Sequence, residues 1–146
     1  MTVAAVLRAK GPDVICVAPF ATVPEIAEII ASRRIGAVVV LDPERNMVGI
    51  VSERDIVRAV AEHGAGALKR TAEDLMSRKV VTAAPDTPVD RAMEIMDAGY
   101  FRHLPVVQGG ELVGIVSIRD LVKHRILQQQ EEMEGLRAGV ARPAPG

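Results

Sequence analysis

The 146-residue sequence predicts a mixed α/β fold made of two similar halves, residues 1–71 and 72–146, that pack against each other. A seven-residue motif occurs twice, as GIVSERD at Gly49–Asp55 and as GIVSIRD at Gly114–Asp120. The apolar positions before each copy also recur, 66 residues apart upstream (23 to 89) and 65 apart at the motif (49 to 114). A unit present only twice does not form a solenoid, which needs three or more stacked repeats. A pair of packed lobes is therefore expected.

The first half begins with a short amphipathic helix that ends near Gly11 and continues as a β-α-β-β-α unit. Thr22 and Glu25 have the spacing of a capping box, which predicts the start of a helix. The run Ala37–Leu41 is apolar and rich in valine, as expected of a strand buried on both faces. The expected elements are Thr2–Lys10, Val14–Val17, Thr22–Arg34, Ala37–Leu41, Met47–Val51 and Ser52–Glu62.

The second half repeats this order after a glycine-containing linker at His63–Thr71 and a helical turn at Ala72–Met76. Its expected elements are strand Val80–Ala83, helix Pro88–Ala98, strands His103–Val107 and Glu111–Val116, and a helix from Ile118 onward. The two helices of each half cannot cover both faces of its three short strands, so the halves are expected to pack face to face.

The last helix is expected to extend well beyond the repeat. Its apolar residues follow a 4-3-4 spacing interrupted by the polar Gln129, which indicates a contact with another subunit. These residues are Val122, Ile126, Met133, Leu136 and Val140. A flexible tail is expected over Ala141–Gly146.

The composition argues against several classes of protein. With 18 basic and 19 acidic residues the net charge is −1, so nucleic-acid binding is not expected. No apolar stretch is long enough to span a bilayer, and no secretory signal is visible. The single cysteine excludes an internal disulfide, so a cytoplasmic location is expected. The three histidines lack the spacing of metal ligands, and the common nucleotide-enzyme motifs are absent, so we expect neither a metal site nor an enzyme.

The repeated motif has two interpretations. Ser-x-x-Asp before an apolar-periodic segment is a variant of the capping box, in which serine caps a helix and aspartate folds back onto it. Alternatively, the serine hydroxyl, the neighbouring arginine and the carboxylate form a binding site. The N–H groups and dipole at a helix start favour an anion, the arginine suits phosphate, and the carboxylate can accept both hydroxyls of a ribose.

Two β-α-β-β-α units that each end in Gly-hydrophobic-hydrophobic-Ser-x-x-Asp resemble the paired CBS (cystathionine β-synthase) domains, also called a Bateman module. The resemblance covers about Val14–Arg125. It implies two repeats packed about a pseudo-twofold axis, with two clefts that hold adenine nucleotides. One repeat would hold ribose and phosphate, and the other would hold the base. AMP is the first candidate ligand, with ATP, ADP, NAD(H) and S-adenosylmethionine as alternatives; whether a metal accompanies the ligand stays open.

Carried over by position, the resemblance implies two sites. In the first, serine and aspartate hold ribose, cations hold phosphate, and apolar residues contact the base. The residues of the first site are Ser117, Asp120, Arg119, Arg102, His103, Ile15, Cys16, Ile35 and Gly36. Those of the second site are Ser52, Asp55, Arg54, Val81, Thr82 and Phe101.

Two further expectations concern individual residues. Because Gly36 and Ala37 stand where the second repeat has Arg102 and His103, the Ser52 site should lack two cations and bind a phosphorylated ligand more weakly. Cys16 is expected to be buried in a strand.

The expected function is a non-catalytic regulatory module that senses adenine nucleotides, forms a homodimer and signals to a downstream protein. One alternative is a structural dimerisation module in which the motifs are only helix caps. The other is a nucleotide-processing enzyme.

Overall fold

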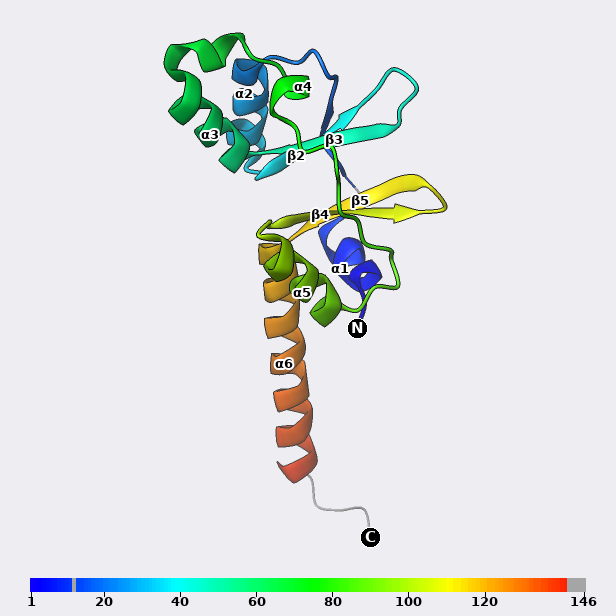
Figure 1. Ribbon diagram of the computed structural model, residues 1–146. Coiled ribbons are helices and arrows are strands. Elements are labelled where there is room, and N and C mark those ends of the chain that lie inside the picture. The colour runs from blue at the N-terminus through cyan, green and yellow to red at the C-terminus, as the bar shows by residue number, and fades with distance from the viewer. Residues whose placement is uncertain (12, 142–146) are drawn as a thin grey trace.

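The two halves of the chain form two lobes whose sheets face each other (Figure 1). The computed structural model describes residues 1–11 and 13–141. The first lobe contains β1 (Cys16–Val17), α2 (Val23–Arg33), β2 (Ala37–Leu41), β3 (Met47–Ser52), α3 (Glu53–His63), η1 (Gly64–Lys69) and α4 (Ala72–Leu75). The second lobe contains α1 (Val3–Lys10), α5 (Val89–Gly99), β4 (His103–Gln108), β5 (Glu111–Ser117) and α6 (Ile118–Ala141). The predicted mixed α/β fold of two repeated halves with an added helix at each end is confirmed.

Local sequence signals set the ends of the helices. The predicted capping box starts α2: the Thr22 hydroxyl accepts from the Glu25 N–H (3.4 Å), and the Glu25 carboxylate accepts from the Thr22 N–H (3.2 Å). The residues that cap the ends of α2 and α5, Arg34 and Tyr100, are both in the left-handed conformation, with φ of 53° and 57°. This shared ending stops each helix shortly before the central strand of its lobe.

The central strand of each lobe pairs antiparallel with the next strand, β2 with β3 and β4 with β5. In the first lobe, β1 adds a third strand parallel to β2. The strand predicted over Val80–Ala83 is wrong, because only a parallel bridge from Ala83 to Val106 forms there. A proline follows two residues after β1 and two residues after Ala83, and proline has no N–H with which to extend the pairing. The residues before Ala83 cross between the lobes (Figure 1).

Each lobe contains one helix from the other half of the chain: α1 packs in the second lobe, and α4 packs in the first. Val3 and Val6 of α1 are buried in the core of the second lobe, and the Val3 N–H donates to the Thr87 carbonyl (2.9 Å). Ala72 and Met76, at the two ends of α4, are buried in the core of the first lobe. The chain therefore crosses between the lobes after α1 and again after α4 (Figure 1). A division at residue 71 separates the repeats along the sequence but does not separate the lobes in space.

β2 is buried on both faces, as its apolar run predicts. Val38 and Val40 belong to the core of the first lobe. Val39 lies between them and points to the opposite face, yet it is fully buried too. Pro105 has the equivalent position in β4 and is also fully buried. The inner faces of the two sheets are therefore covered, and the lobes meet across them (Figure 1).

α6 extends far beyond the second lobe (Figure 1). The predicted apolar positions Val122, Ile126, Met133 and Leu136 are 38%, 49%, 55% and 67% exposed. The side chain of Val140 lies outside the described part of the chain, as does the predicted tail after Ala141, the last residue of α6. Among the described residues, no helix combines the length and the apolar character needed to cross a membrane.

Candidate functional site

The duplicated motif places one serine at the start of α3 and another at the start of α6. In α3, the Ser52 N–H donates to Asp55 Oδ2 (2.8 Å), and the Ser52 hydroxyl accepts from the Asp55 N–H (3.3 Å). In α6, the Ser117 N–H donates to Asp120 Oδ2 (2.8 Å), and the Ser117 hydroxyl accepts from the Asp120 N–H (3.1 Å). The capping interpretation is confirmed at both helices.

Capping leaves part of each carboxylate free for a ligand. The hydrogen bonds that Asp55 and Asp120 accept fall on Oδ2, and the described residues provide none to Oδ1. Each aspartate also lines a cavity between the lobes, a smaller one at Asp55 and a larger one at Asp120. The capping and binding interpretations are therefore compatible.

The larger cavity has a volume of about 1040 Å³. One side is formed by the first lobe, from Ile15 and the segment between α2 and β2. The other side is formed by the end of β5 and the start of α6. Its cationic residues are Lys10, Arg34, Arg102, Arg119 and Lys123. Its acidic residues are Asp13, Glu53 and Asp120. The excess of cations favours an anionic ligand.

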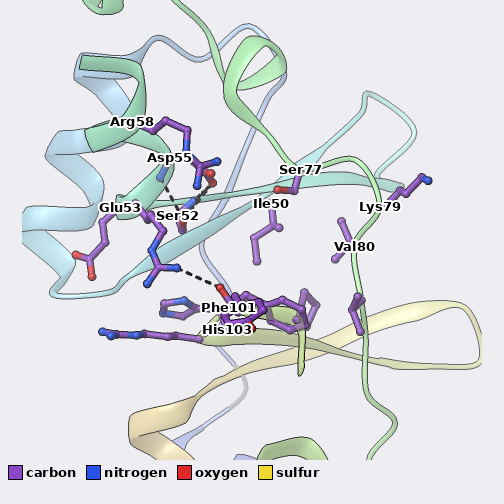
Figure 2. A pocket seen from close by; sticks show the side chains of 16 residues that line it. Ile50, Ser52, Glu53, Asp55, Arg58, Ser77, Lys79, Val80, Phe101 and His103 are labelled. Carbon is purple, nitrogen blue, oxygen red and sulfur yellow. Dashed lines mark hydrogen bonds between the residues drawn. The ribbon is translucent and has the colours of Figure 1, made fainter. Parts of the chain in front are cut away.

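The smaller cavity has a volume of about 260 Å³ and lies between the start of α3 and the start of β4. Figure 2 shows Ser52 and Asp55 on one side of it, with Phe101 and His103 on the other. Its charged residues are Glu53, Arg54, Asp55, Arg58, Lys79 and Arg102. Cations again outnumber carboxylates.

The structure brings together most of the predicted site residues. Those predicted for the first site line the larger cavity, except Cys16. Those predicted for the second site line the smaller cavity, except Thr82. Their contact with a ligand stays a prediction. Cys16 is exposed rather than buried, because successive strand residues point to opposite faces and Val17 takes the core side. Thr82 is exposed in the segment that crosses between the lobes.

Arg102 and His103 line both cavities. The expectation that the Ser52 site lacks these two cations is therefore wrong. The repeat alignment assigns the pair to one half of the chain, but the pair lies on the wall that the two cavities share. A difference in affinity between the cavities needs another origin.

The imidazole of His103 packs against the backbone of Gly36. A Cβ at residue 36 would lie 2.5 Å from His103 Nε2, so a larger residue there would displace the ring. Burial lowers the pKa of His103; the Glu53 carboxylate opposes this effect, and the nearby Lys10 and Arg102 add to it. His103 is therefore neutral near pH 7 in the free protein, and a phosphate beside it would favour its protonated form.

Lys10 is a residue of the larger cavity that the sequence analysis did not identify. Its ammonium lies 2.8 Å from Asp120 Oδ2 and 2.8 Å from the Ile115 carbonyl oxygen. Burial raises the pKa of Asp120, but the hydrogen bonds from Lys10 and Ser117 outweigh burial and hold this pKa below its usual range. A sequence signal existed: nine residues run from threonine to lysine at both Thr2–Lys10 and Thr71–Lys79, and the second lysine lines the smaller cavity.

The smaller cavity also differs from the sequence prediction in its details. Arg54 donates through Nη1 to the Tyr100 carbonyl (3.2 Å) and so connects the start of α3 with the end of α5. Arg58 of α3 and Ser77 also line the cavity, and the spacing of the motif did not predict either of them. In the described part of the chain, no group of three His, Cys, Asp or Glu residues is arranged to hold a metal ion.

The family model of the CBS domain matches the chain twice, at residues 7–62 and 72–126. A CBS-domain containing protein from Agrobacterium tumefaciens is 43% identical, with a TM-score of 0.83 and coverage of 85% of this chain and 92% of that chain. A CBS domain protein from Pyrobaculum aerophilum complexed with AMP is 35% identical, with a TM-score of 0.73 and coverage of 82% and 89%. The CBS domain pair of protein MJ0100, in complex with 5-methylthioadenosine and S-adenosyl-L-methionine, is 29% identical, with a TM-score of 0.75 and coverage of 84% and 98%.

The chain is short in comparison with the curated proteins it matches. It spans between 59% and 64% of the length of the first of these relatives.

Proposed function

Since the chain belongs to the CBS domain family and is a tandem pair of these domains, we propose that it is a non-catalytic regulatory module that binds an adenine nucleotide between its two repeats. The main support is that both Ser-x-x-Asp helix starts line cavities shared by the two lobes. AMP, 5-methylthioadenosine and S-adenosylmethionine, which the solved relatives hold, have adenine and its ribose ring in common. AMP is the first candidate for this chain, and ADP, ATP and NAD(H) are the alternatives.

The larger cavity is the proposed principal site. Small-molecule sites in proteins usually have volumes of about 300–1,000 Å³. The larger cavity, at about 1040 Å³, has room for such a ligand, whereas the smaller cavity, at about 260 Å³, is below this range. In this proposal Asp120 accepts the ribose hydroxyls, and Arg102 and Arg119 donate to phosphate. Ile15 and Ile35 cover the base through apolar contact, worth about 25 cal/mol per Å² buried. The described residues that line the larger cavity include no phenylalanine, tyrosine or tryptophan to stack on the base, so a dissociation constant on the order of micromolar is expected.

The proposed signal is a change in how the two lobes are oriented. A ligand that touches Ile35 in the first lobe and Asp120 in the second stabilises the arrangement in which both contacts are made. The change would pass to a second copy of the chain, through the exposed apolar stripe of α6, and from there to a downstream protein.

The test is binding of a panel of AMP, ADP, ATP, NADH and S-adenosylmethionine, measured by thermal shift and calorimetry. We expect a saturable rise in melting temperature with at least one of them. Asp120→Ala should weaken that binding by about tenfold or more, since a charge-assisted hydrogen bond is worth about 1.5–3 kcal/mol. The ligand should be recovered chemically unchanged, whereas conversion of it would support the enzyme alternative.

Asp74→Ala is the matched control. Asp74 belongs to another capping box, in which its Oδ2 accepts from the Thr71 N–H (3.0 Å) at the start of α4, and it lines neither cavity. Its removal should lower stability through loss of the capping bond and leave nucleotide affinity unchanged. If no adenylate raises the melting temperature and Asp120→Ala behaves like Asp74→Ala, the structural dimerisation module is the better description.

A further inference from the structure

The ion pair between Lys10 and Asp120 joins two elements of the second lobe that are 110 residues apart in the sequence. Lys10 is the last residue of α1, and its side chain is 31% exposed at the edge of the larger cavity. The Ile115 carbonyl, also 2.8 Å from the ammonium, fixes its position. Lys10 therefore stands beside the carboxylate to which the proposed function assigns the ribose.

Asp120 cannot keep all of its present bonds when a ribose binds. Its Oδ2 accepts from both the Ser117 N–H and the Lys10 ammonium, and each carboxylate oxygen has about two acceptor positions. A ribose that places its two hydroxyls on the two oxygens of the carboxylate needs one of the positions on Oδ2. The Ser117 N–H is fixed by the helix start, so Lys10 is the group that has to leave.

We propose that Lys10 makes the larger cavity selective for adenosine that carries a 5′-phosphate, an inference that rests on the proposed function. Displaced from Asp120, the ammonium needs a new anion. A phosphate on the same ligand provides one, whereas unphosphorylated adenosine breaks the ion pair and offers nothing in return. The lysine thus penalises the nucleoside and favours the nucleotide.

The smaller cavity provides an internal comparison. Oδ2 of Asp55 accepts from the N–H and the hydroxyl of Ser52, so no lysine has to be displaced there. Lys79, the counterpart of Lys10 in the repeated segment, lines that cavity, but its ammonium points away from Asp55 (Figure 2). Preference for a 5′-phosphate should therefore be weaker in the smaller cavity.

The experiment compares AMP with adenosine by titration calorimetry. The background variant Asp55→Asn disables the smaller cavity, so that the heat reports the larger one. In this background the protein should bind AMP more tightly than adenosine. Adding Lys10→Met should reduce the ratio of the two affinities by about tenfold, by weakening AMP and leaving adenosine unchanged or tighter. Lys79→Met is the matched control and should leave the ratio unchanged, and Lys10→Arg should restore most of it.

Circular dichroism establishes that each variant is folded, and Lys10→Gln replaces Lys10→Met if the latter is not. The inference is overturned if loss of the Lys10 charge leaves the ratio unchanged, or if it weakens AMP and adenosine by the same factor, as a purely structural role would. If the wild-type chain binds neither compound and no other member of the nucleotide panel, the proposed function itself is wrong. Binding of both with a ratio that ignores Lys10 rejects the inference alone.

Discussion

Asp55 and Asp120 come from the same seven-residue motif but have different neighbours. Of the described residues, only Ser52 donates hydrogen bonds to Asp55, whereas Asp120 accepts from Ser117 and from Lys10, which a distant helix supplies. The motif explains why each carboxylate stands at a helix start. The chemistry of each cavity then depends on side chains that other elements bring to it.

His103 provides a pH-dependent prediction at the same scale. Because burial lowers the pKa of His103, its ring is neutral near pH 7 before the ligand arrives, and a bound phosphate should shift it toward the protonated form. AMP binding should therefore take up a proton, and affinity should rise as the pH falls from about 8 to about 6. Calorimetry in two buffers of different ionisation enthalpy measures the uptake.

His103→Gln is the control for that experiment, since the phosphate group of AMP itself titrates with a pKa of about 6 in both proteins. The variant should show only the contribution of the phosphate. Identical pH dependence in the variant and the wild type would show that His103 does not respond to the ligand.

At the scale of the elements, the exchange of α1 and α4 between the lobes depends on close contact between helix and strand. A Cβ on Gly114 of β5 would lie 2.6 Å from Leu7 Cδ2 of α1, and a Cβ on Gly49 of β3 would lie 2.5 Å from Met76 Sδ. The glycine that opens each copy of the motif therefore leaves space for the helix that has crossed from the other half.

Gly114→Ala should destabilise the fold by about 1–3 kcal/mol, because the new methyl group overlaps the Leu7 side chain. Gly49→Ala should cost at least as much, since the new methyl group would also lie 2.8 Å from Met76 Cβ, which moves only with the backbone. Urea unfolding measures both effects. In a Leu7→Ala background, Gly114→Ala should lower the free energy of unfolding by less than it does in the wild type. If the two costs are additive, overlap with Leu7 is not the cause of the destabilisation.

At the scale of the whole molecule, the two lobes cover each other's sheets but leave apolar helix surface uncovered. The stripe of α6 is exposed at Val122, Ile126, Met133 and Leu136. The helix itself extends far beyond the second lobe (Figure 1). Most of the stability of a helix in a protein comes from packing of its apolar face, so the extension is expected to need a partner. A second copy of the chain is the proposed partner.

Ile126→Glu combined with Met133→Glu should convert a dimer into a monomer, because two charges would have to be buried in the apolar seam. Sedimentation velocity measures the change in mass. Gln128→Glu, about 120° around α6 from the centre of the stripe, should leave the dimer intact. A wild-type chain that sediments as a monomer at a concentration of about 100 μM would rule out the seam.

Several features of this protein could be predicted from local patterns in its sequence. The repeat predicted two lobes, the Thr22–Glu25 and Ser-x-x-Asp spacings predicted helix starts, and the valine run Ala37–Leu41 predicted a strand buried on both faces. Position within the repeat also placed most candidate residues around the right cavities. Each of these depends on residues that are neighbours in the chain or are related by the duplication.

Only the tertiary structure decided which elements share a cavity. It placed α1 in the second lobe, brought Lys10 to Asp120, set Arg102 and His103 on the wall between both cavities, and left Cys16 exposed. These outcomes depend on where the chain crosses between the lobes. Hydrophobic periodicity specifies which face of a helix is buried, but not the lobe in which it is buried, because the two lobes offer similar apolar surfaces.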